Sequence, residues 1–216
     1  LPALVNTIVM TLVSLLIAVP LGVFSAVYLT EYAKRGNKLV TIVGITTETL
    51  SGIPSIVYGL FGYLLFVTKL KWSYSMLAGA LTLAIMILPL IMRTTEEALR
   101  SVPDSYREGS FGLGAGKLRT VFTVVLPSAV PGILAGVILA IGRIAGETAA
   151  LIFTAGTVAQ IPKNLMGSGR TLAVHLYALW NEGLAAEQSY ATAVVLLIIV
   201  VLINMLSSFI AKKLAK

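Results

Sequence analysis

The sequence predicts an all-α fold, a polytopic bundle of membrane-spanning helices. Hydrophobic residues make up 57% of the 216 residues, charged residues only 12%, and the mean hydropathy is +0.95. A soluble domain carries about 25% charged residues, so this chain could not cover its own surface in water. The apolar runs are long and do not alternate with polar residues, which excludes a membrane-spanning β-barrel. In lipid, the remaining solution is a set of helices whose backbone groups bond within each helix.

Five apolar runs are long enough to cross a bilayer, which requires about 20 helical residues. We expect the spans at residues 4–29, 39–67, 75–92, 131–153 and 191–210. The third helix is expected to continue into water toward Arg100.

The second span contains two features that are unusual for a helix in lipid. Pro54 follows Ser51, Gly52 and Ile53 and predicts a bend, because proline removes a backbone donor. Such a bend is a possible gate hinge, and helix packing alone is the alternative. Glu48 is expected to face the bundle or the pore, or to lie near the cytoplasmic interface.

The basic residues are distributed unevenly between the two ends of the spans. Eleven of the sixteen lie after spans one and three and at the C-terminus, four lie in the opposite loops, and Arg143 lies within span four. The positive-inside rule places the richer loops in the cytoplasm. This predicts that Gly36, Gly114 and Lys216 are cytoplasmic and that Gly169 is external. Membrane topology thus accounts for the net charge of +7, and no nucleic-acid partner is expected.

The first residue is Leu1, which this topology places outside. Residues 1–30 are too long for a signal peptide and lack its basic flank. We therefore expect upstream sequence, with one further span before Leu1. The chain has no cysteine and one histidine, His175, so neither a metal site nor a cofactor is predicted.

The most informative polar segment lies between spans three and four. Glu108 is followed by two small residues, Gly109 and Ser110, then by Gly114, and later by Val124-Val125-Leu126-Pro127. This spacing resembles the cytoplasmic coupling loop of ABC importer permeases of type I, which have the MetI-like fold. The resemblance implies that residues 101–127 form a loop within a permease domain covering residues 1–216, and that a short helix of this loop sits in a groove of an ATPase subunit. The family carries alanine at both small positions.

The same segment predicts a helix, a sharp turn and a second helix. Ser101 is expected to cap a helix over residues 103–113, which the glycines up to Gly116 then end. Tyr106 and Phe111 would be apolar anchors on this helix, alongside Leu113. The alternative is a solvated loop that merely joins two spans.

Residues 112–117 are rich in glycine but do not fit a nucleotide-binding motif. The phosphate loop needs a glycine five residues before Gly116, where Phe111 stands, and a hydroxyl residue after Lys117, where Leu118 stands. We therefore expect that the chain is not an enzyme and that any ATP hydrolysis belongs to a separate chain.

Arg143 and Glu147 form a charged pair within span four. Residues four apart share one face of a helix, and a charge near the bilayer centre costs at least about 2.5–3.5 kcal/mol. The pair either neutralises itself and fixes helix packing, or lines the substrate path. In the second case the planar guanidinium suits phosphate, because it can donate two bonds to one oxyanion. The residues alone leave both readings open.

Three stretches sharpen the resemblance. They are residues 140–149 (AIGRIAGETA), 51–62 (SGIPSIVYGLFG) and 126–133 (LPSAVPGI). They resemble signatures of the phosphate-importer permeases, specifically the PstA-type subunit, and the match extends over essentially the whole chain. The resemblance implies phosphate passage at Arg143 and Glu147, in the cell membrane of a prokaryote. It also implies a second permease subunit forming a heterodimer, a homodimeric ATP-binding subunit and an extracytoplasmic phosphate-binding protein.

Three other functions compete with a phosphate permease. A permease of the same fold could carry another oxyanion, such as sulfate or molybdate. An ion-coupled secondary transporter would need no ATPase, and so would have no need for the coupling loop. A membrane-embedded enzyme finds no support, because the sequence shows no Ser–His, zinc or paired-carboxylate constellation.

Overall fold

The computed structural model describes residues 1–34, 36–183 and 186–214. These residues form helices, with no strand among them, and the longest connection is the loop over residues 155–171 between α8 and α9. The elements are α1 (Pro2–Val27), η1 (Tyr28–Tyr32), α2 (Lys38–Ser51), α3 (Ser55–Gly62), η2 (Tyr63–Lys69), α4 (Met76–Arg100), α5 (Asp104–Gly112), α6 (Lys117–Thr120), η3 (Val121–Val125), α7 (Leu126–Gly146), α8 (Ala149–Thr154), α9 (Leu172–Glu182) and α10 (Ala186–Leu214). The predicted all-α class is confirmed.

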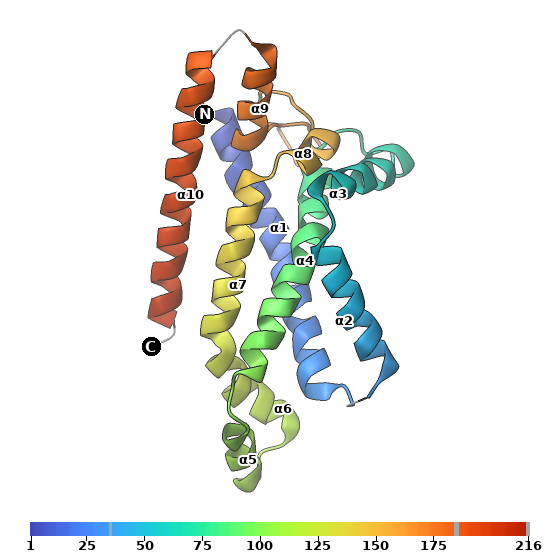
Figure 1. Cartoon of the computed structure of the whole chain (residues 1–216), viewed down its shortest axis with the longest axis vertical. Coiled ribbons are helices and arrows are strands. Elements are labelled where there is room, and N and C mark those ends of the chain that lie inside the picture. The colour runs from blue at the N-terminus through green and yellow to red at the C-terminus, as the bar shows by residue number, and fades with distance from the viewer. Residues whose placement is uncertain (35, 184–185, 215–216) are drawn as a thin grey trace.

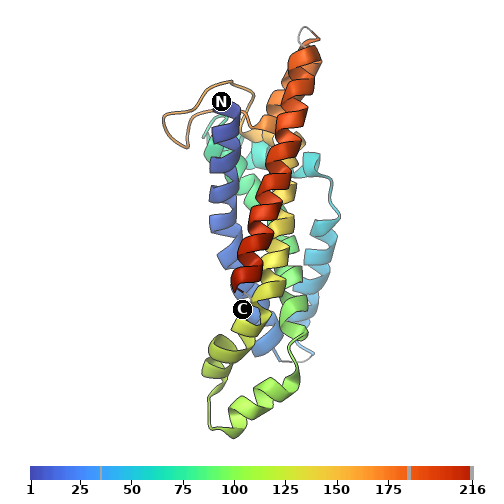
Figure 2. The same ribbon diagram turned by 90° about the vertical axis from the view of Figure 1, so that its left-hand side faces the viewer.

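The long helices run side by side along the longest axis of the molecule (Figures 1 and 2). Among the described residues, four helices are long and apolar enough to cross a membrane: Pro2–Tyr32, Met76–Arg100, Lys117–Gly146 and Ala186–Phe209. A fifth crossing is possible where two shorter helices, Val40–Ser51 and Ser55–Lys69, meet at a bend. The predicted number of spans fits this arrangement, and the helix that begins at Met76 does continue to Arg100.

The second predicted span, residues 39–67, is not one helix. Its two halves meet at 104°, so that α3 lies across the bundle while α2 runs along it (Figure 1). The break lies at the predicted position, because Pro54 is extended with ψ 141° and caps α3. A proline disfavours helical geometry in the residue before it, which ends α2 and lets the chain change direction.

The fourth span also differs from its predicted range of 131–153. Its helix begins earlier, at Lys117, and ends at Gly146. Glu147 has extended geometry with ψ 127°, and a separate short helix, α8, follows. Pro127 therefore lies inside this helix, directly after the π-helical turn η3, where α7 begins.

The core is built around α4. In the most apolar window of this helix 67% of the residues are buried, against none in the corresponding window of α10. One apolar cluster, including Met10, Leu83 and Ile87, joins α1 to α4. A second cluster, including Leu99 and Val125, closes the bundle beside residues 101–127, which we call the coupling segment. Within the described part of this chain α10 therefore has an uncovered apolar surface, which lipid or another subunit must cover.

The segments predicted to lie on opposite sides of the membrane lie at opposite ends of the bundle. The turn at Gly36 and helix α5 lie at one end, and the loop between α8 and α9, which contains Gly169, lies at the other (Figure 1). The predicted cytoplasmic position of Lys216 lies outside the described residues.

Candidate functional site

The coupling segment projects beyond the bundle as a helix, a turn and a second helix (Figure 2). Helix α5 covers Asp104–Gly112, and a turn at Gly114, with φ +83°, leads to α6 at Lys117. From there the helix runs on through η3 into α7. The predicted boundaries are confirmed. The predicted cap is wrong, because Pro103 occupies the cap position of α5 and the hydroxyl of Ser101 donates to the carbonyl of Ala98 at 2.7 Å.

Three large apolar side chains on and just after α5 face outward. Tyr106 is 52% exposed, Phe111 46% and Leu113 91%, and no residue of α5 is buried. Large apolar side chains gathered on a projecting helix are typical of a surface that binds another protein. Glu108 and Gly109 are also exposed, and a Cβ added at Gly109 would meet open space.

Ser110 is directed differently from its neighbours. Its hydroxyl forms a hydrogen bond of 2.8 Å with the hydroxyl of Thr120 in α6. This contact ties α5 to the helix that leads into α7. Of the six predicted coupling residues, Ser110 thus makes a contact within the chain, and Gly114 supplies the positive φ of the turn.

Arg143 and Glu147 do not share a helix face. Arg143 lies half-buried in the last turn of α7, and the helix ends before Glu147. Glu147 is 8% exposed, and its carboxylate accepts the backbone N–H of Ala150 at 3.0 Å, at the start of α8. Among the described residues no ion pair joins the two side chains. The predicted shared helix face is therefore wrong, because the chain leaves the helix between the two residues, and the reading as a self-neutralising pair loses its basis.

Tyr58 belongs to the same region, and the sequence reasoning missed it. This residue of α3 is 5% exposed, and its hydroxyl donates to the carbonyl of Leu50 at 2.7 Å, across the break at Pro54. Gly59, beside Tyr58, packs directly on the backbone of Ala150 in α8. The spacing of Gly59 and Gly62 is the sequence signal for the close approach of α3 to another helix, since small residues three or four apart mark close helix contacts in membranes.

The two possible gate residues lie in different surroundings. Pro54 stands at the break beside the Tyr58 hydrogen bond. Glu48 is exposed and does not face the core of this chain. It lines a hollow of about 320 Å³ between α2 and α4, together with Arg93, Glu96 and Arg100. Among the residues with described positions, no three His, Cys, Asp or Glu side chains lie close enough to hold a metal ion.

Known proteins resemble this chain over most of its length. Residues 18–216 match the sequence profile of the family described as "Binding-protein-dependent transport system inner membrane component". The "Probable ABC transporter permease protein YqgI" of Bacillus subtilis is 41% identical over 197 residues, covering 85% of this chain and 67% of that protein. The "Phosphate transport system permease protein PstA 1" of Mycobacterium tuberculosis is 37% identical over 211 residues, covering 96% and 68%. The "Phosphate transport system permease protein PstA" of Yersinia pestis is 39% identical over 199 residues, covering 91% and 67%.

Solved structures share the fold. The inward-facing MetNI methionine ABC transporter, in its native crystal form, aligns with a TM-score of 0.77 at 23% identity and covers all of this chain and 94% of the other. A bacterial alginate ABC transporter in complex with its periplasmic protein aligns with a TM-score of 0.76 at 14% identity, covering 100% and 79%. At these identities the likeness shows the fold, which is the MetI-like fold of type I ABC importer permeases. This chain is accordingly a multi-pass membrane protein that belongs to the family of inner membrane components of binding-protein-dependent transport systems.

Proposed function

We propose that this chain is a permease subunit of an ATP-driven importer of inorganic phosphate and forms one half of its translocation path. The observation that carries the proposal is the position of Arg143. Arg143 is half-buried in the last turn of a membrane helix, and among the described residues it belongs to no ion pair. An unneutralised charge in a membrane span is costly and usually faces a substrate path. The relatives named as phosphate permeases support the choice of anion.

A guanidinium is chemically suited to this anion. Its planar fork can donate two parallel hydrogen bonds to one oxyanion. Glu147 is held in place by the Ala150 N–H, so its negative charge is fixed near the end of α7. We propose that this charge limits how tightly the anion binds, which allows release after each cycle. The Tyr58 hydroxyl bridges the break at Pro54 through its hydrogen bond to Leu50, and a change of bend at this break would open or close the path.

The coupling segment, residues 101–127, supplies the proposed link to ATP. Tyr106, Phe111 and the exposed Glu108 and Gly109 would dock into a separate homodimeric ATP-binding subunit, while Ser110 and Gly114 shape the docking helix. A second permease subunit would complete the path as a heterodimer. An extracytoplasmic phosphate-binding protein would deliver the anion. ATP binding would then move α5, and alternating access would follow.

Uptake of labelled phosphate tests this function. The chain would be produced with its partner subunits in cells that lack any other phosphate importer, and the membrane abundance of each variant would be measured. Arg143→Gln and the double variant with Glu147→Gln should lose about 10- to 100-fold in uptake, because a hydrogen bond to a charged group contributes about 1.5–3 kcal/mol. Arg143→Lys should be intermediate, since it keeps the charge and loses the fork.

Two controls make the result specific. Arg93→Gln removes an arginine of α4 whose side chain is 58% exposed, and should leave uptake near its original value. Excess sulfate or molybdate should not compete; competition by either would assign the path to that oxyanion. Uptake by the Arg143→Gln, Glu147→Gln variant that equals the unaltered chain at equal abundance would contradict the proposed anion path.

A further inference from the structure

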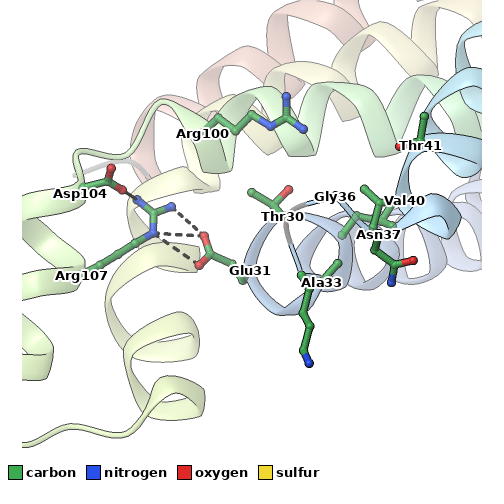
Figure 3. A pocket seen from close by; sticks show the side chains of 12 residues that line it. Thr30, Glu31, Ala33, Gly36, Asn37, Val40, Thr41, Arg100, Asp104 and Arg107 are labelled. Atoms are coloured by element: carbon green, nitrogen blue, oxygen red, sulfur yellow. Dashed lines mark hydrogen bonds and ion pairs between the residues drawn. The ribbon is translucent and has the colours of Figure 1, made fainter.

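Apolar burial does not hold the coupling helix in place, because no residue of α5 is buried. Its attachment to the bundle is polar. Figure 3 shows the main contact, in which the Arg107 side chain extends from α5 toward Glu31, at the end of the first span. The Arg107 side chain is 16% exposed and that of Glu31 only 9%. The pair is therefore shielded from water, unlike a surface ion pair, which contributes little.

The guanidinium of Arg107 joins three elements. Its Nη2 donates to the Glu31 carboxylate at 2.7 Å and to the carbonyl of Leu99 at 2.9 Å, and its Nη1 donates to the carbonyl of Val102 at 2.8 Å. Leu99 lies in the last turn of α4, where carbonyls have no partner within the helix. The hydrogen bond with Glu31 also raises the pKa of Arg107. One side chain thus fixes α5 to the ends of α4 and of the first span.

The first span is tied at its other end as well. Asn6, which is 1% exposed, donates from Nδ2 to the carbonyl of Gln160 at 2.8 Å and of Arg170 at 3.1 Å. The hydroxyl of Thr7 accepts the backbone N–H of Leu172 at 2.9 Å. These bonds anchor the start of α1 to the loop between α8 and α9 and to the first residue of α9. That loop lies at the end of the bundle opposite to α5 (Figure 1).

Between these two anchors the helix is unbroken. Residues Pro2–Tyr32 form one continuous helical segment of 31 residues, with Pro20 inside it and a π-helical last turn; its length is about 46 Å at 1.5 Å per residue. Its final turn, η1, carries Glu31. A continuous helix bonded at both ends passes on axial displacement and rotation better than a chain of loops, because its length is fixed by its own hydrogen bonds.

We infer that this helix mechanically links the coupling helix to the external loop, with Arg107 and Glu31 as positioning residues at one end and Asn6 at the other. The inference rests on the proposed function, in which α5 docks on an ATPase and the opposite face receives a binding protein. Docking outside then shifts α1, and the Glu31–Arg107 bond passes the shift to α5. Loss of either anchor leaves both partners bound but no longer communicating.

The test uses the complete complex in proteoliposomes and measures ATP hydrolysis with and without the phosphate-loaded binding protein. Glu31→Gln and Asn6→Leu, which alter opposite ends of the helix, should both lose the stimulation by at least about 10-fold, the equivalent of 1.4 kcal/mol. Unstimulated hydrolysis should persist in both. Glu97→Gln is the matched control, because its carboxylate pairs with Arg93 at 3.1 Å on an exposed face, and it should keep full stimulation.

A covalent substitute for the ion pair separates coupling from folding. The chain has no native cysteine, so the variant with Glu31→Cys and Arg107→Cys can be joined by a short bismaleimide. Stimulation should be low before the crosslink and restored after it. Full stimulation in Glu31→Gln or Asn6→Leu, or no recovery on crosslinking, would overturn the inference. Failure of the unaltered complex to respond to phosphate-loaded binding protein would instead refute the proposed function.

Discussion

Gly59 lies where α3 and α8 approach most closely, and its replacement by alanine should disturb the proposed site. A Cβ at this position would lie 2.8 Å from the Cα of Ala150 and 3.1 Å from the carbonyl oxygen of Ala149. Favourable contacts between carbon atoms are about 3.5–4.0 Å. The two helices would therefore have to separate by about 1 Å, because the atoms in the way belong to the backbone and cannot rotate aside.

The cost follows from this displacement. Overpacking of a close contact costs about 1–3 kcal/mol, and for a protein of this size each kcal/mol lowers the melting temperature by roughly 2–4 °C. Gly59→Ala should thus melt roughly 2–12 °C lower. The same shift moves Ala150, whose N–H holds the Glu147 carboxylate at 3.0 Å, so phosphate uptake per assembled complex should also fall.

The melting temperature is measured by heating the complex in detergent to a series of temperatures. Size-exclusion chromatography then quantifies the complex that remains intact after each heating step. Gly44→Ala is the control, because this glycine lies within α2 and a Cβ there would meet nothing within 4 Å. It should be neutral or stabilising by about 0.5–1 kcal/mol, since alanine favours a helix more than glycine does. If Gly59→Ala melts at the temperature of the unaltered complex and transports normally, the close contact between α3 and α8 is not real.

Three further predictions concern the coupling segment and the topology. Gly114→Val should lose assembly or stimulated ATP hydrolysis, because φ +83° costs a β-branched residue about 1–3 kcal/mol; normal co-purification and turnover would count against the docking role. Gly109→Ala should keep both, since within this chain the added Cβ meets open space; loss of binding would show that the docked partner leaves no room for a Cβ at this position. Single cysteines at positions 36 and 114 should react with an impermeant thiol reagent only after the cells are opened, and one at 169 in intact cells; labelling of position 114 from outside would reverse the assignment.

The elements that the sequence predicts well are those fixed by local chemistry. Hydropathy defines the spans, because about 20 apolar residues have no stable alternative in lipid. The helix boundaries within residues 101–127 are predicted nearly to the residue. Pro103 favours a helix start, and Gly114 favours a turn because glycine readily adopts the positive φ found there. Pro54 likewise marked the break in span two, although the 104° angle depends on what α3 packs against and has no local signal.

The contacts that hold the site together are long-range, and periodicity cannot reveal them. Arg107 and Glu31 are 76 residues apart in the sequence. Asn6 is hydrogen-bonded to Gln160 and Arg170, which follow it by 154 and 164 residues. A charge pattern identifies each residue as polar but not its partner. Tyr58 was read only as part of a signature, because its hydrogen bond to Leu50 exists only once the chain has bent at Pro54.

The treatment of Arg143 and Glu147 shows why this distinction matters for function. A separation of four residues pairs two side chains only while the helix continues, and here it ends at Gly146. Beyond the end of α7, two contacts hold the chain: the Glu147 carboxylate accepts the backbone N–H of Ala150, and Ala150 in α8 packs on Gly59. The Glu147 carboxylate is bonded to the Ala150 N–H and does not pair with Arg143. Among the described residues the guanidinium of Arg143 forms no ion pair, and under the proposed function a passing oxyanion would supply the opposite charge.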